Sequence, residues 1–439
     1  MKKYDAVVIG SGVAGLSAAY GLKAAEKQVL VVEENLWGGT CPNRGCDPKK
    51  ILLNGVEARK RIEQLIGKGF SDVPPVDWAE LQAFKRTFTD PVSKNRQEEL
   101  AAAKIDHLSG TAQFIDPQTI KVGEETITAE HYVLATGQRP AILPIEGKEF
   151  LQTSTDFLAL EKLPKEIIFI GAGYIAFELA MIAHAAGSKV TIVHHNQQPL
   201  KGFEEELVNS LVEQMQKAGI TFIFDFESQR VIQEASTYRL VSKDKELQAD
   251  AIFVATGRRP NIEHLQLEQA GVHTVKQGIV VNEYLQTSNP NIFACGDIIA
   301  KNEPKLTPVA TFEGTYVADY LTGKTAPIHY PVIPTIVYSS PKVAQVGRTK
   351  KQATEKDQVT DVSMIDWFTY RRVNEPLAKA QLTYDANDFL VGAAVISEQA
   401  DDLINDLTLL INQKVKKAEL DQWILGYPTL ASDLSYLLK

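Results

Sequence analysis

The stretch Gly10-Ser11-Gly12-Val13-Ala14-Gly15 follows an apolar run from Tyr4 to Ile9 and opens a segment with helical periodicity. In such a strand–turn–helix unit, glycines allow a tight turn and a close approach of the backbone to a pyrophosphate, whose charge then lies at a helix N-terminus. Glu33 ends the next apolar run, about 20 residues further on, where a carboxylate can accept hydrogen bonds from ribose hydroxyls. The alternative is a glycine-rich turn beside an exposed glutamate. The order of strand, turn and helix favours a dinucleotide-binding unit that uses Gly10, Gly12, Gly15 and Glu33.

A second unit of the same design begins at residue 166. An apolar run, residues 166–170, leads into Gly171-Ala172-Gly173-Tyr174-Ile175-Ala176, a helical segment and a further apolar run, residues 189–194. Ala176 replaces the third glycine with another small residue, which helix–strand packing permits. Gly171 and Gly173 therefore predict a second dinucleotide site.

The residues that follow this second unit concern the choice of nucleotide. No acidic residue ends the apolar run; His194 and His195 stand there, and Lys201 follows. Nothing at these positions repels a 2′-phosphate and several groups could attract one, which favours NADPH over NADH. The alternative is a set of solvated surface residues, because a neutral histidine contributes little charge at pH 7.

Each unit closes with a similar phrase, residues 133–137 and 253–257, in which an apolar strand ends in Thr-Gly. Such an ending suits a strand tip beside a bound ligand. After about residue 330 the composition changes to short β-rich segments with prolines, followed by a helical stretch from about Gln399. This change predicts a separate C-terminal domain.

Length and charge limit the classes of function. A chain of 439 residues with 44% hydrophobic content is expected to form two to four domains. The net charge of -9, without a basic run, argues against nucleic acid or an anionic membrane as the main partner, and no stretch approaches 18 apolar residues. Lys2 and Lys3 precede an apolar run, but Asp5 interrupts it, so a signal peptide is not predicted and the expected location is cytoplasmic.

Two of the three cysteines, Cys41 and Cys46, stand five residues apart before a helix expected to begin near Pro48; the third is Cys295. A disulfide-stapled secreted fold needs more cysteines, and four-ligand zinc binding needs two further ligands nearby, so no metal site is predicted. A helix N-terminus and basic neighbours lower a thiol pKa. The pair is therefore expected to exchange electrons.

At these residues the chain resembles the class I pyridine nucleotide-disulfide oxidoreductases, the family of glutathione reductase, dihydrolipoamide dehydrogenase and mercuric reductase. Residues 38–50 match the family signature GGTCxNxGCxPxK, and residues 173–178 match its NAD(P) motif. Residues 293–297 match its second FAD motif, and residues 306–310 match the segment beside the flavin. The resemblance covers essentially the whole length.

The resemblance implies an α/β fold with two Rossmann-like dinucleotide-binding domains, for FAD and NAD(P), plus a C-terminal α+β dimerisation domain. It implies a homodimer that contains FAD, oxidises NADPH or NADH and reduces a small-molecule electron acceptor. The implied boundaries are 1–145 for the first part of the FAD-binding domain, 146–262 for the NAD(P)-binding domain, 263–328 for the second part of the FAD-binding domain and 329–439 for the dimerisation domain.

Residue roles also follow from the resemblance. Tyr174 would swing aside to admit the nicotinamide, Cys46 would be the charge-transfer thiol and Cys41 would attack the substrate. Lys49, or alternatively Lys50, would pair with Glu178 near the flavin N5, where positive charge favours the anionic reduced flavin. Asp297 would bind the ribityl chain, whereas Cys295 is expected only to pack. The other implied cofactor contacts are Gly39, Thr40, Ala112, Thr136, Gly137, Gly257, Gly296, Leu306, Thr307 and Ala310.

The chain departs from the family pattern near its C-terminus. Disulfide reductases of this family carry a His-Pro-Thr-x-x-Glu segment that supplies an acid/base from the partner subunit, whereas residues 427–432 here read Tyr-Pro-Thr-Leu-Ala-Ser. A positioned acid/base contributes about 10²–10⁴ in rate, and a phenol matches neutral pH poorly. The arginines that bind glutathione in relatives are Tyr20 and Thr315 here, and the C-terminal Cys-Cys pair of mercuric reductases is absent. Tyr427 is either catalytic or a packing residue.

Three hypotheses follow. The first is an NADPH-dependent flavoenzyme whose cysteine pair reduces a disulfide or another thiol-reactive acceptor. The second is a diaphorase-like reductase of metal ions or quinones. The third is a non-catalytic redox sensor that retains FAD, against which the second nucleotide motif argues.

Overall fold

The computed structural model describes residues 2–438. The chain forms two compact units, which are described separately below. Unit 1 comprises residues 1–49, 83–141 and 257–329, and unit 2 comprises residues 50–82, 142–256 and 330–439. Two of the boundaries between the units fall within helices, α3 (Cys46–Gln64) and α4 (Trp78–Thr89).

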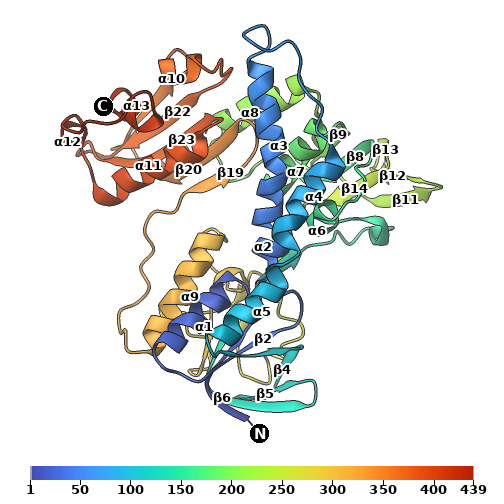
Figure 1. Cartoon of the computed structure of the whole chain (residues 1–439), viewed down its shortest axis with the longest axis vertical. Coiled ribbons are helices and arrows are strands. Elements are labelled where there is room, and N and C mark those ends of the chain that lie inside the picture. Colours follow the sequence, from blue (N-terminus) through green and yellow to red (C-terminus); the bar gives the residue numbers. More distant parts are fainter. Residues whose placement is uncertain (1, 439) are drawn as a thin grey trace. The chain divides into compact units, whose positions relative to one another are not determined.

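Unit 1 is built on a seven-stranded sheet in the order β3-β2-β1-β6-β5-β4, with β18 also paired to β6 (Figure 1). Strands β3, β2, β1, β6 and β18 pair with one another in parallel, whereas β5 pairs antiparallel with both β6 and β4. The central strand β2 is buried throughout, as expected of a parallel strand covered on both faces. The strands are β1 Lys2–Ile9, β2 Val29–Glu33, β3 Asp106–Ser109, β4 Ala112–Asp116, β5 Thr119–Val122, β6 Glu125–Leu134 and β18 Ile292–Ala294.

Helices α1 and α9 lie side by side in unit 1 and are drawn in blue and gold in Figure 1. Small residues permit their close approach: a Cβ on Gly314 would lie 2.1 Å from the Ala14 carbonyl oxygen, and one on Gly21 would lie 2.6 Å from Ala318 Cβ. The close packing of α1 and α9 thereby holds residues 12–15 near the segment that begins at residue 307. The remaining elements of unit 1 are α1 Val13–Ala24, α2 Thr40–Arg44, α5 Val92–Ala102, α9 Thr307–Leu321, and the short strand pairs β7 Gln138–Pro140 with β15 Arg258–Pro260 and β16 Thr274–Val275 with β17 Gly278–Ile279.

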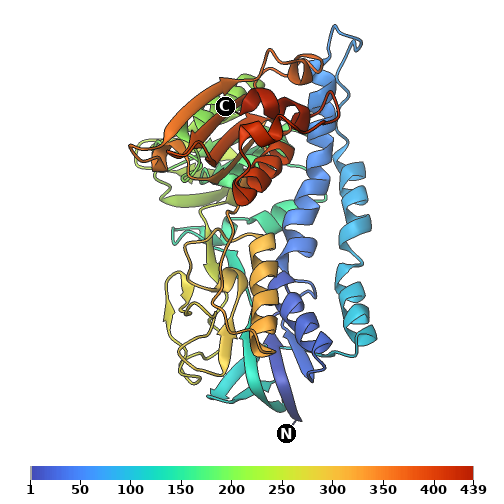
Figure 2. The same cartoon turned by 90° about the vertical axis from the view of Figure 1, so that its left-hand side faces the viewer.

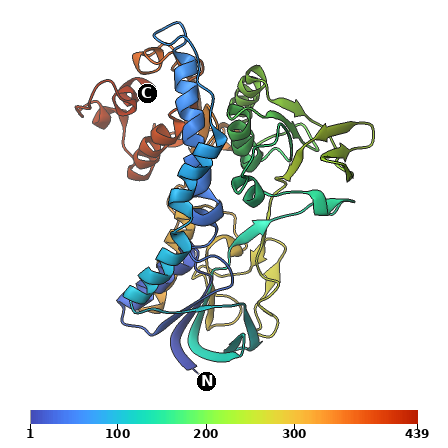
Figure 3. The same ribbon diagram turned by 45° about the vertical axis from the view of Figure 1, so that its right-hand side comes forward.

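The middle of the chain forms a second, four-stranded parallel sheet in unit 2, in the order β10-β9-β8-β14. A three-stranded antiparallel sheet, β11-β12-β13, is inserted between β10 and β14 along the chain and is olive in Figure 3. The elements are α6 Ser154–Leu158, β8 Glu166–Ile170, α7 Tyr174–Ala185, β9 Lys189–Val193, α8 Glu205–Ala218, β10 Thr221–Ile223, β11 Arg230–Glu234, β12 Thr237–Val241, β13 Glu246–Ala249 and β14 Ala251–Val254.

The C-terminal part of unit 2 is a five-stranded antiparallel sheet in the order β19-β20-β23-β22-β21. Helix α11 packs on β20 and β23 and buries its apolar stripe there (Figure 2). The elements are β19 Thr335–Val337, β20 Lys342–Gly347, β21 Gln358–Ser363, α10 Phe368–Arg371, β22 Lys379–Tyr384, β23 Leu390–Ser397, α11 Ala400–Gln413, α12 Lys417–Leu420 and α13 Leu430–Leu437.

The predicted fold class is confirmed: two parallel sheets follow the two glycine turns, and an α+β part ends the chain. The four domain boundaries remain a prediction. The helix expected near Pro48 begins two residues earlier, so that Cys46 is its first residue. None of the helices within residues 2–438 is long and apolar enough to cross a membrane.

Candidate active site

In the first glycine turn, the packing of the protein requires glycine at positions 10 and 15 but not at position 12. Gly10 has φ +106°, and a Cβ on Gly15 would lie 1.9 Å from the Gly10 carbonyl oxygen, so both positions need glycine for the protein's own packing. Gly12 instead has φ -69° and ψ 178°, which any residue adopts, and a Cβ there would meet no atom within 4 Å. The open space above Gly12, at the N-terminus of α1, fits the pyrophosphate of a dinucleotide.

Glu33 at the end of β2 fixes this turn. Its carboxylate is buried and accepts hydrogen bonds from Ser11 N and Ser11 Oγ, both at 2.8 Å, and from Asn35 N at 2.9 Å. Ser11 Oγ in turn accepts from Gly38 N at 3.0 Å. Oε2 accepts both bonds from Ser11, whereas Oε1 accepts only the bond from Asn35 and keeps acceptor capacity for a further donor. Ribose binding by Glu33 remains a prediction that this geometry supports.

The other predicted FAD contacts in unit 1 lie on strand ends and helix starts. Thr136 donates to the Asn261 carbonyl oxygen at 2.6 Å, and Asn261 Nδ2 donates to the Thr136 carbonyl oxygen at 2.8 Å. Asp297 is half-buried just after β18, and Leu306 precedes α9, which begins at Thr307. Gly39 has no room for a side chain, because a Cβ there would lie 2.7 Å from Gly12 Cα. Ala112 is buried on β4, inside the sheet core.

The two thiols of the cysteine pair share one hydroxyl group. Cys41 lies on α2 and Cys46 begins α3, and Gly45 between them has no room for a Cβ, which would lie 2.9 Å from the Thr40 carbonyl oxygen. Thr307 Oγ1 lies 3.4 Å from Cys46 Sγ and donates to Cys41 Sγ, also at 3.4 Å. No disulfide joins the two cysteines, and both are only partly buried. The arrangement places two sulfurs where they can form and break one disulfide.

The pKa of Cys41 corrects the expectation of a lowered value. The hydrogen bond with the Cys46 side chain raises the pKa of the Cys41 thiol, burial and the charge of Cys46 raise it further, and the Thr307 hydroxyl opposes them. The helix N-terminus and the basic neighbours, on which the expectation rested, would by themselves lower this pKa. In the dithiol, Cys41 therefore keeps a proton while Cys46 lies at the start of the long helix.

The second glycine turn, in unit 2, repeats the logic of the first. Gly171 has φ +105°, and a Cβ on it would lie 2.6 Å from the Ala255 carbonyl oxygen. A Cβ on Gly173 would make only an ordinary contact, 3.9 Å from the same oxygen. Tyr174 begins α7 with 46% of its surface exposed. The turn therefore leaves room for a second pyrophosphate.

The candidate 2′-phosphate residues differ in their ability to carry charge. Burial lowers the pKa of His194, and the charge of His195 lowers it further, so this imidazole is neutral at pH 7. The two rings contact each other edge to face at 4.5 Å, and Lys201 is exposed. The expected attraction of His194 for a phosphate is therefore limited to hydrogen bonding, and Lys201 is the group of the three that carries a full positive charge.

Glu178 lies one turn into α7 and is 1% exposed. Its Oε1 accepts the backbone N–H of Tyr338 at 2.8 Å, and Lys50 Nζ lies 4.2 Å above the centre of the Tyr338 ring. Lys50, which is exposed, thus faces an aromatic ring within unit 2, whereas Lys49 belongs to unit 1. Which lysine serves the flavin remains a prediction, with Lys49 as its first choice.

Tyr427 is 66% exposed and stacks on Phe368 with ring centres 6.0 Å apart. The residue at the position of the family's glutamate, Ser432, is engaged in capping α13, where it exchanges hydrogen bonds with Thr429. The next residue, Asp433, is a buried carboxyl whose pKa burial raises. Among the described residues, no carboxylate is hydrogen-bonded to Tyr427 in the manner of a dyad.

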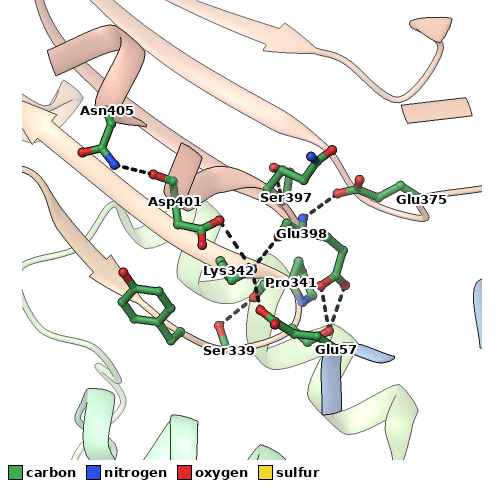
Figure 4. A network of polar contacts seen from close by, with 12 residues as sticks. Glu57, Ser339, Pro341, Lys342, Glu375, Ser397, Glu398, Asp401 and Asn405 are labelled. Carbon is green, nitrogen blue, oxygen red and sulfur yellow. Dashed lines mark hydrogen bonds and ion pairs between the residues drawn. The ribbon is translucent and has the colours of Figure 1, made fainter. Parts of the chain in front are cut away.

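Sequence reasoning missed a buried polar cluster in unit 2 (Figure 4). Lys342 Nζ lies 2.7 Å from Glu57 Oε1 and 3.4 Å from Asp401 Oδ1, and it donates to the Glu398 carbonyl oxygen at 2.8 Å. Glu57 lies on α3, so the cluster ties this helix to the C-terminal sheet within unit 2. No motif or periodicity in the sequence signals such contacts, because the partners come from separate elements.

Glu375 adds a pH dependence to this cluster. Its Oε1 accepts the Glu398 N–H at 2.6 Å. Burial raises the pKa of Glu375 from 4.5 to about 7, and the negative charge of Glu398 adds to this, while Arg61 and Lys342 oppose it. The folded chain therefore holds a proton that the unfolded chain has already lost between these two pH values.

We expect stability to fall as pH rises through this window. The contribution is fully present below about pH 4.5 and lost by about pH 7, at about 1.4 kcal/mol per pH unit, or ~3–4 kcal/mol in all. Glu375→Gln cannot ionise and keeps an acceptor for the Glu398 N–H. It should flatten the decline and unfold at a higher temperature than the wild type at pH 8, whereas Glu355→Gln, at an exposed position, should follow the wild type. Parallel curves of melting temperature against pH for Glu375→Gln and the wild type would contradict the expectation.

Comparison with known proteins identifies the family of the chain. Residues 4–314 match the family described as pyridine nucleotide-disulphide oxidoreductase, and residues 333–437 match the dimerisation domain of that family. A mercuric reductase from Staphylococcus aureus is 34% identical over 448 residues, covering 98% of this chain and 81% of that protein. A glutathione reductase from Burkholderia cepacia is 32% identical over 445 residues, covering 99% of this chain and 98% of that protein.

A solved structure extends the likeness to three dimensions. It is the Cu(II) complex of a mutant of the HOCl-induced flavoprotein disulfide reductase RclA from Escherichia coli, with a TM-score of 0.90 and 25% identity, covering 100% of this chain and 99% of that one. The chain therefore belongs to the pyridine nucleotide-disulphide oxidoreductase family, as an FAD-dependent enzyme that uses NAD(P)H.

Proposed function

We propose that this enzyme passes electrons from NADPH through FAD to the Cys41–Cys46 pair and on to a disulfide or another thiol-reactive acceptor. One observation carries the proposal: the two partly accessible sulfurs share the Thr307 hydroxyl at 3.4 Å in the unit that also holds the first dinucleotide turn. Bound FAD would accept a hydride from NAD(P)H and return two electrons to the Cys41–Cys46 disulfide.

The two sulfurs have different tasks in this proposal. Cys41 keeps its proton in the dithiol and lies on the short helix α2. It is assigned the attack on the acceptor, which follows loss of that proton to solvent. Cys46, at the N-terminus of α3, is assigned the thiolate that the helix end stabilises. Thr307 can donate its hydroxyl hydrogen to whichever sulfur carries the charge.

The acceptor is expected to need no proton from a C-terminal dyad. Tyr427 stacks on Phe368 without a carboxylate partner among the described residues, so protonation of a bulky thiolate leaving group lacks its usual acid. A thiophilic metal ion needs no such proton. Because the solved RclA structure is a Cu(II) complex and a similar protein is a mercuric reductase, metal-ion reduction is the second candidate function, with Cu(II) as the first ion to test.

A panel of acceptors separates these functions. NADPH oxidation at 340 nm is followed with purified holoprotein and glutathione disulfide, lipoamide, Cu(II), Hg(II) or a quinone. We expect turnover with at least one thiol-reactive acceptor and slow turnover with glutathione disulfide. Flavin reduction by NADPH without steady-state turnover for any acceptor would contradict the enzyme proposal and favour a redox sensor.

The preference for NADPH is proposed on Lys201. Reversing its charge in Lys201→Glu should lower kcat/KM for NADPH about tenfold, because one charged contact with the 2′-phosphate is lost, while kcat/KM for NADH changes little. Lys217→Glu, an exposed site on α8, is the matched control. A wild-type preference for NADH, or equal losses with both nucleotides, would contradict the assignment.

A homodimer is proposed on the C-terminal part of unit 2. Residues 333–437 match the family's dimerisation domain, and this part exposes large apolar side chains, among them Ile424 at 101% and Tyr436 at 70%. Such exposure is typical of an interaction surface. We expect twice the chain mass in sedimentation and a shift towards the monomer for Ile424→Lys. A monomeric wild type would contradict the proposal.

A further inference from the structure

A fully buried ion pair lies beneath the second FAD motif in unit 1. Glu313, on α9, is 0% exposed, and the Lys301 side chain is 4% exposed. Lys301 Nζ donates to Glu313 Oε1 at 2.5 Å. Burial of two charges is costly, and a buried pair is often no more stabilising than apolar residues of the same volume. The pair therefore calls for a reason other than stability.

The second oxygen of Glu313 supplies that reason. Glu313 Oε2 accepts the N–H of Gly296 at 2.6 Å. Gly296 has φ +79°, and a Cβ there would lie 3.0 Å from Ala14 Cβ, so its peptide is held in a left-handed conformation against α1. An ionised acceptor makes a stronger bond to this N–H than a neutral one. Lys301 brings its positive charge against Glu313 inside the core.

The same short segment is held from its other side. Lys305 Nζ donates to the Asp297 carbonyl oxygen at 2.7 Å and to the Gln277 carbonyl oxygen at 3.0 Å. Lys305 is half-buried, and this burial lowers the pKa of its ammonium group. The N–H of Gly296, one residue before Asp297, and the carbonyl group of Asp297 are thus both bound by charged side chains, while Asp297 itself is half-exposed.

We propose that Glu313 is a positioning residue that aims the Asp297 carboxylate at the cofactor. Lys301 is its charge partner, and Lys305 assists by binding the same segment. The inference rests on the proposed role of Asp297 in holding FAD. It assigns Glu313 no contact with the cofactor: Glu313 acts through the Gly296 peptide, and Asp297 makes the contact.

Two neutral double variants test the proposal. K301Q/E313Q keeps a hydrogen-bonded pair and an amide oxygen for the Gly296 N–H, whereas K301M/E313M fills the same space without an acceptor. Holoprotein is diluted stepwise, and released FAD is measured by its fluorescence. Because the Gly296 N–H is left unsatisfied, we expect the FAD dissociation constant of K301M/E313M to exceed that of K301Q/E313Q by about 10–100-fold. Thermal unfolding with excess FAD shows whether each variant is folded.

Asp297→Asn in each background shows whether the effect passes through Asp297. We expect this substitution to weaken FAD binding in the wild type and in K301Q/E313Q, but to add little in K301M/E313M, where the carboxylate is already misaligned. Equal FAD affinity for the two double variants, with Asp297→Asn weakening all backgrounds alike, would overturn the positioning role and leave the cofactor site intact. No effect of Asp297→Asn in any background would defeat the proposed cofactor role itself.

Lys305→Met gives a second test that leaves the buried pair untouched. Lys305 is half-exposed, so the variant should fold even if K301M/E313M does not. We expect a several-fold rise in the FAD dissociation constant that is again absent in the Asp297→Asn background. An unchanged dissociation constant in Lys305→Met would count against the proposal.

Discussion

Replacing Cys41 with serine is expected to lower turnover with disulfides and other thiol-reactive acceptors by at least about 10³-fold. A serine hydroxyl fits the space of the thiol but does not ionise or form a disulfide at neutral pH. Flavin reduction by NADPH should continue at the wild-type rate, because it precedes the step that needs Cys41. Stopped-flow measurement of flavin absorbance gives the first rate, and steady-state NADPH oxidation gives the second.

An internal control comes from the acceptor. Quinones can take electrons from a reduced flavin directly, so Cys41→Ser should retain turnover with a quinone while losing turnover with a disulfide. Cys46→Ser should also lose disulfide turnover. Undiminished turnover of a thiol-reactive acceptor by Cys41→Ser would refute the assigned role of the cysteine pair.

Adding a single methyl group at Gly12 or at Gly15 is expected to separate cofactor binding from folding. A Cβ at position 12 meets no protein atom within 4 Å, so Gly12→Ala should leave the unfolding temperature of the FAD-free chain nearly unchanged. The same Cβ enters the space assigned to the pyrophosphate and should weaken FAD binding by about 100-fold or more, since backbone and phosphate can no longer meet.

Gly15→Ala should behave in the opposite way. Its Cβ would lie 1.9 Å from the Gly10 carbonyl oxygen, so strand β1 and helix α1 must separate for the chain to fold. We expect a loss of several kcal/mol in stability, of the order seen when a core is overpacked, and little soluble protein. If Gly12→Ala lowered the melting temperature of the FAD-free chain as much as Gly15→Ala, the space above Gly12 would not be a ligand site.

The parts of the fold that the sequence predicted are those that depend on local backbone geometry. Gly10 and Gly171 have the positive φ values that a strand-to-helix turn requires, and each turn is followed by the parallel strand order that its motif indicated. Helix α3 begins at Cys46, two residues before Pro48, because α2 ends at Arg44, with Gly45 as its C-cap, and the next helix starts directly after that glycine.

The parts that could not be predicted depend on partners distant in the sequence. The raised pKa of Cys41 arises from Cys46 and is opposed by Thr307, and the latter comes from another helix altogether. Likewise Lys342 and Lys301 read as ordinary charged residues in the sequence, yet both are buried beside carboxylates that only the tertiary fold supplies. Composition and periodicity contain no signal for such pairs.

The hydrogen bonds among Ser11, Glu33 and Gly38 have a consequence for assembly of the enzyme. They brace the first glycine turn with the chain's own donors and acceptors, so we expect the cradle to take its shape during folding. A ligand that enters such a preformed site loses little affinity to the ordering of the protein. We therefore expect the flavin-free protein to bind flavin analogues with altered redox potentials. Such analogues would report on each electron-transfer step separately.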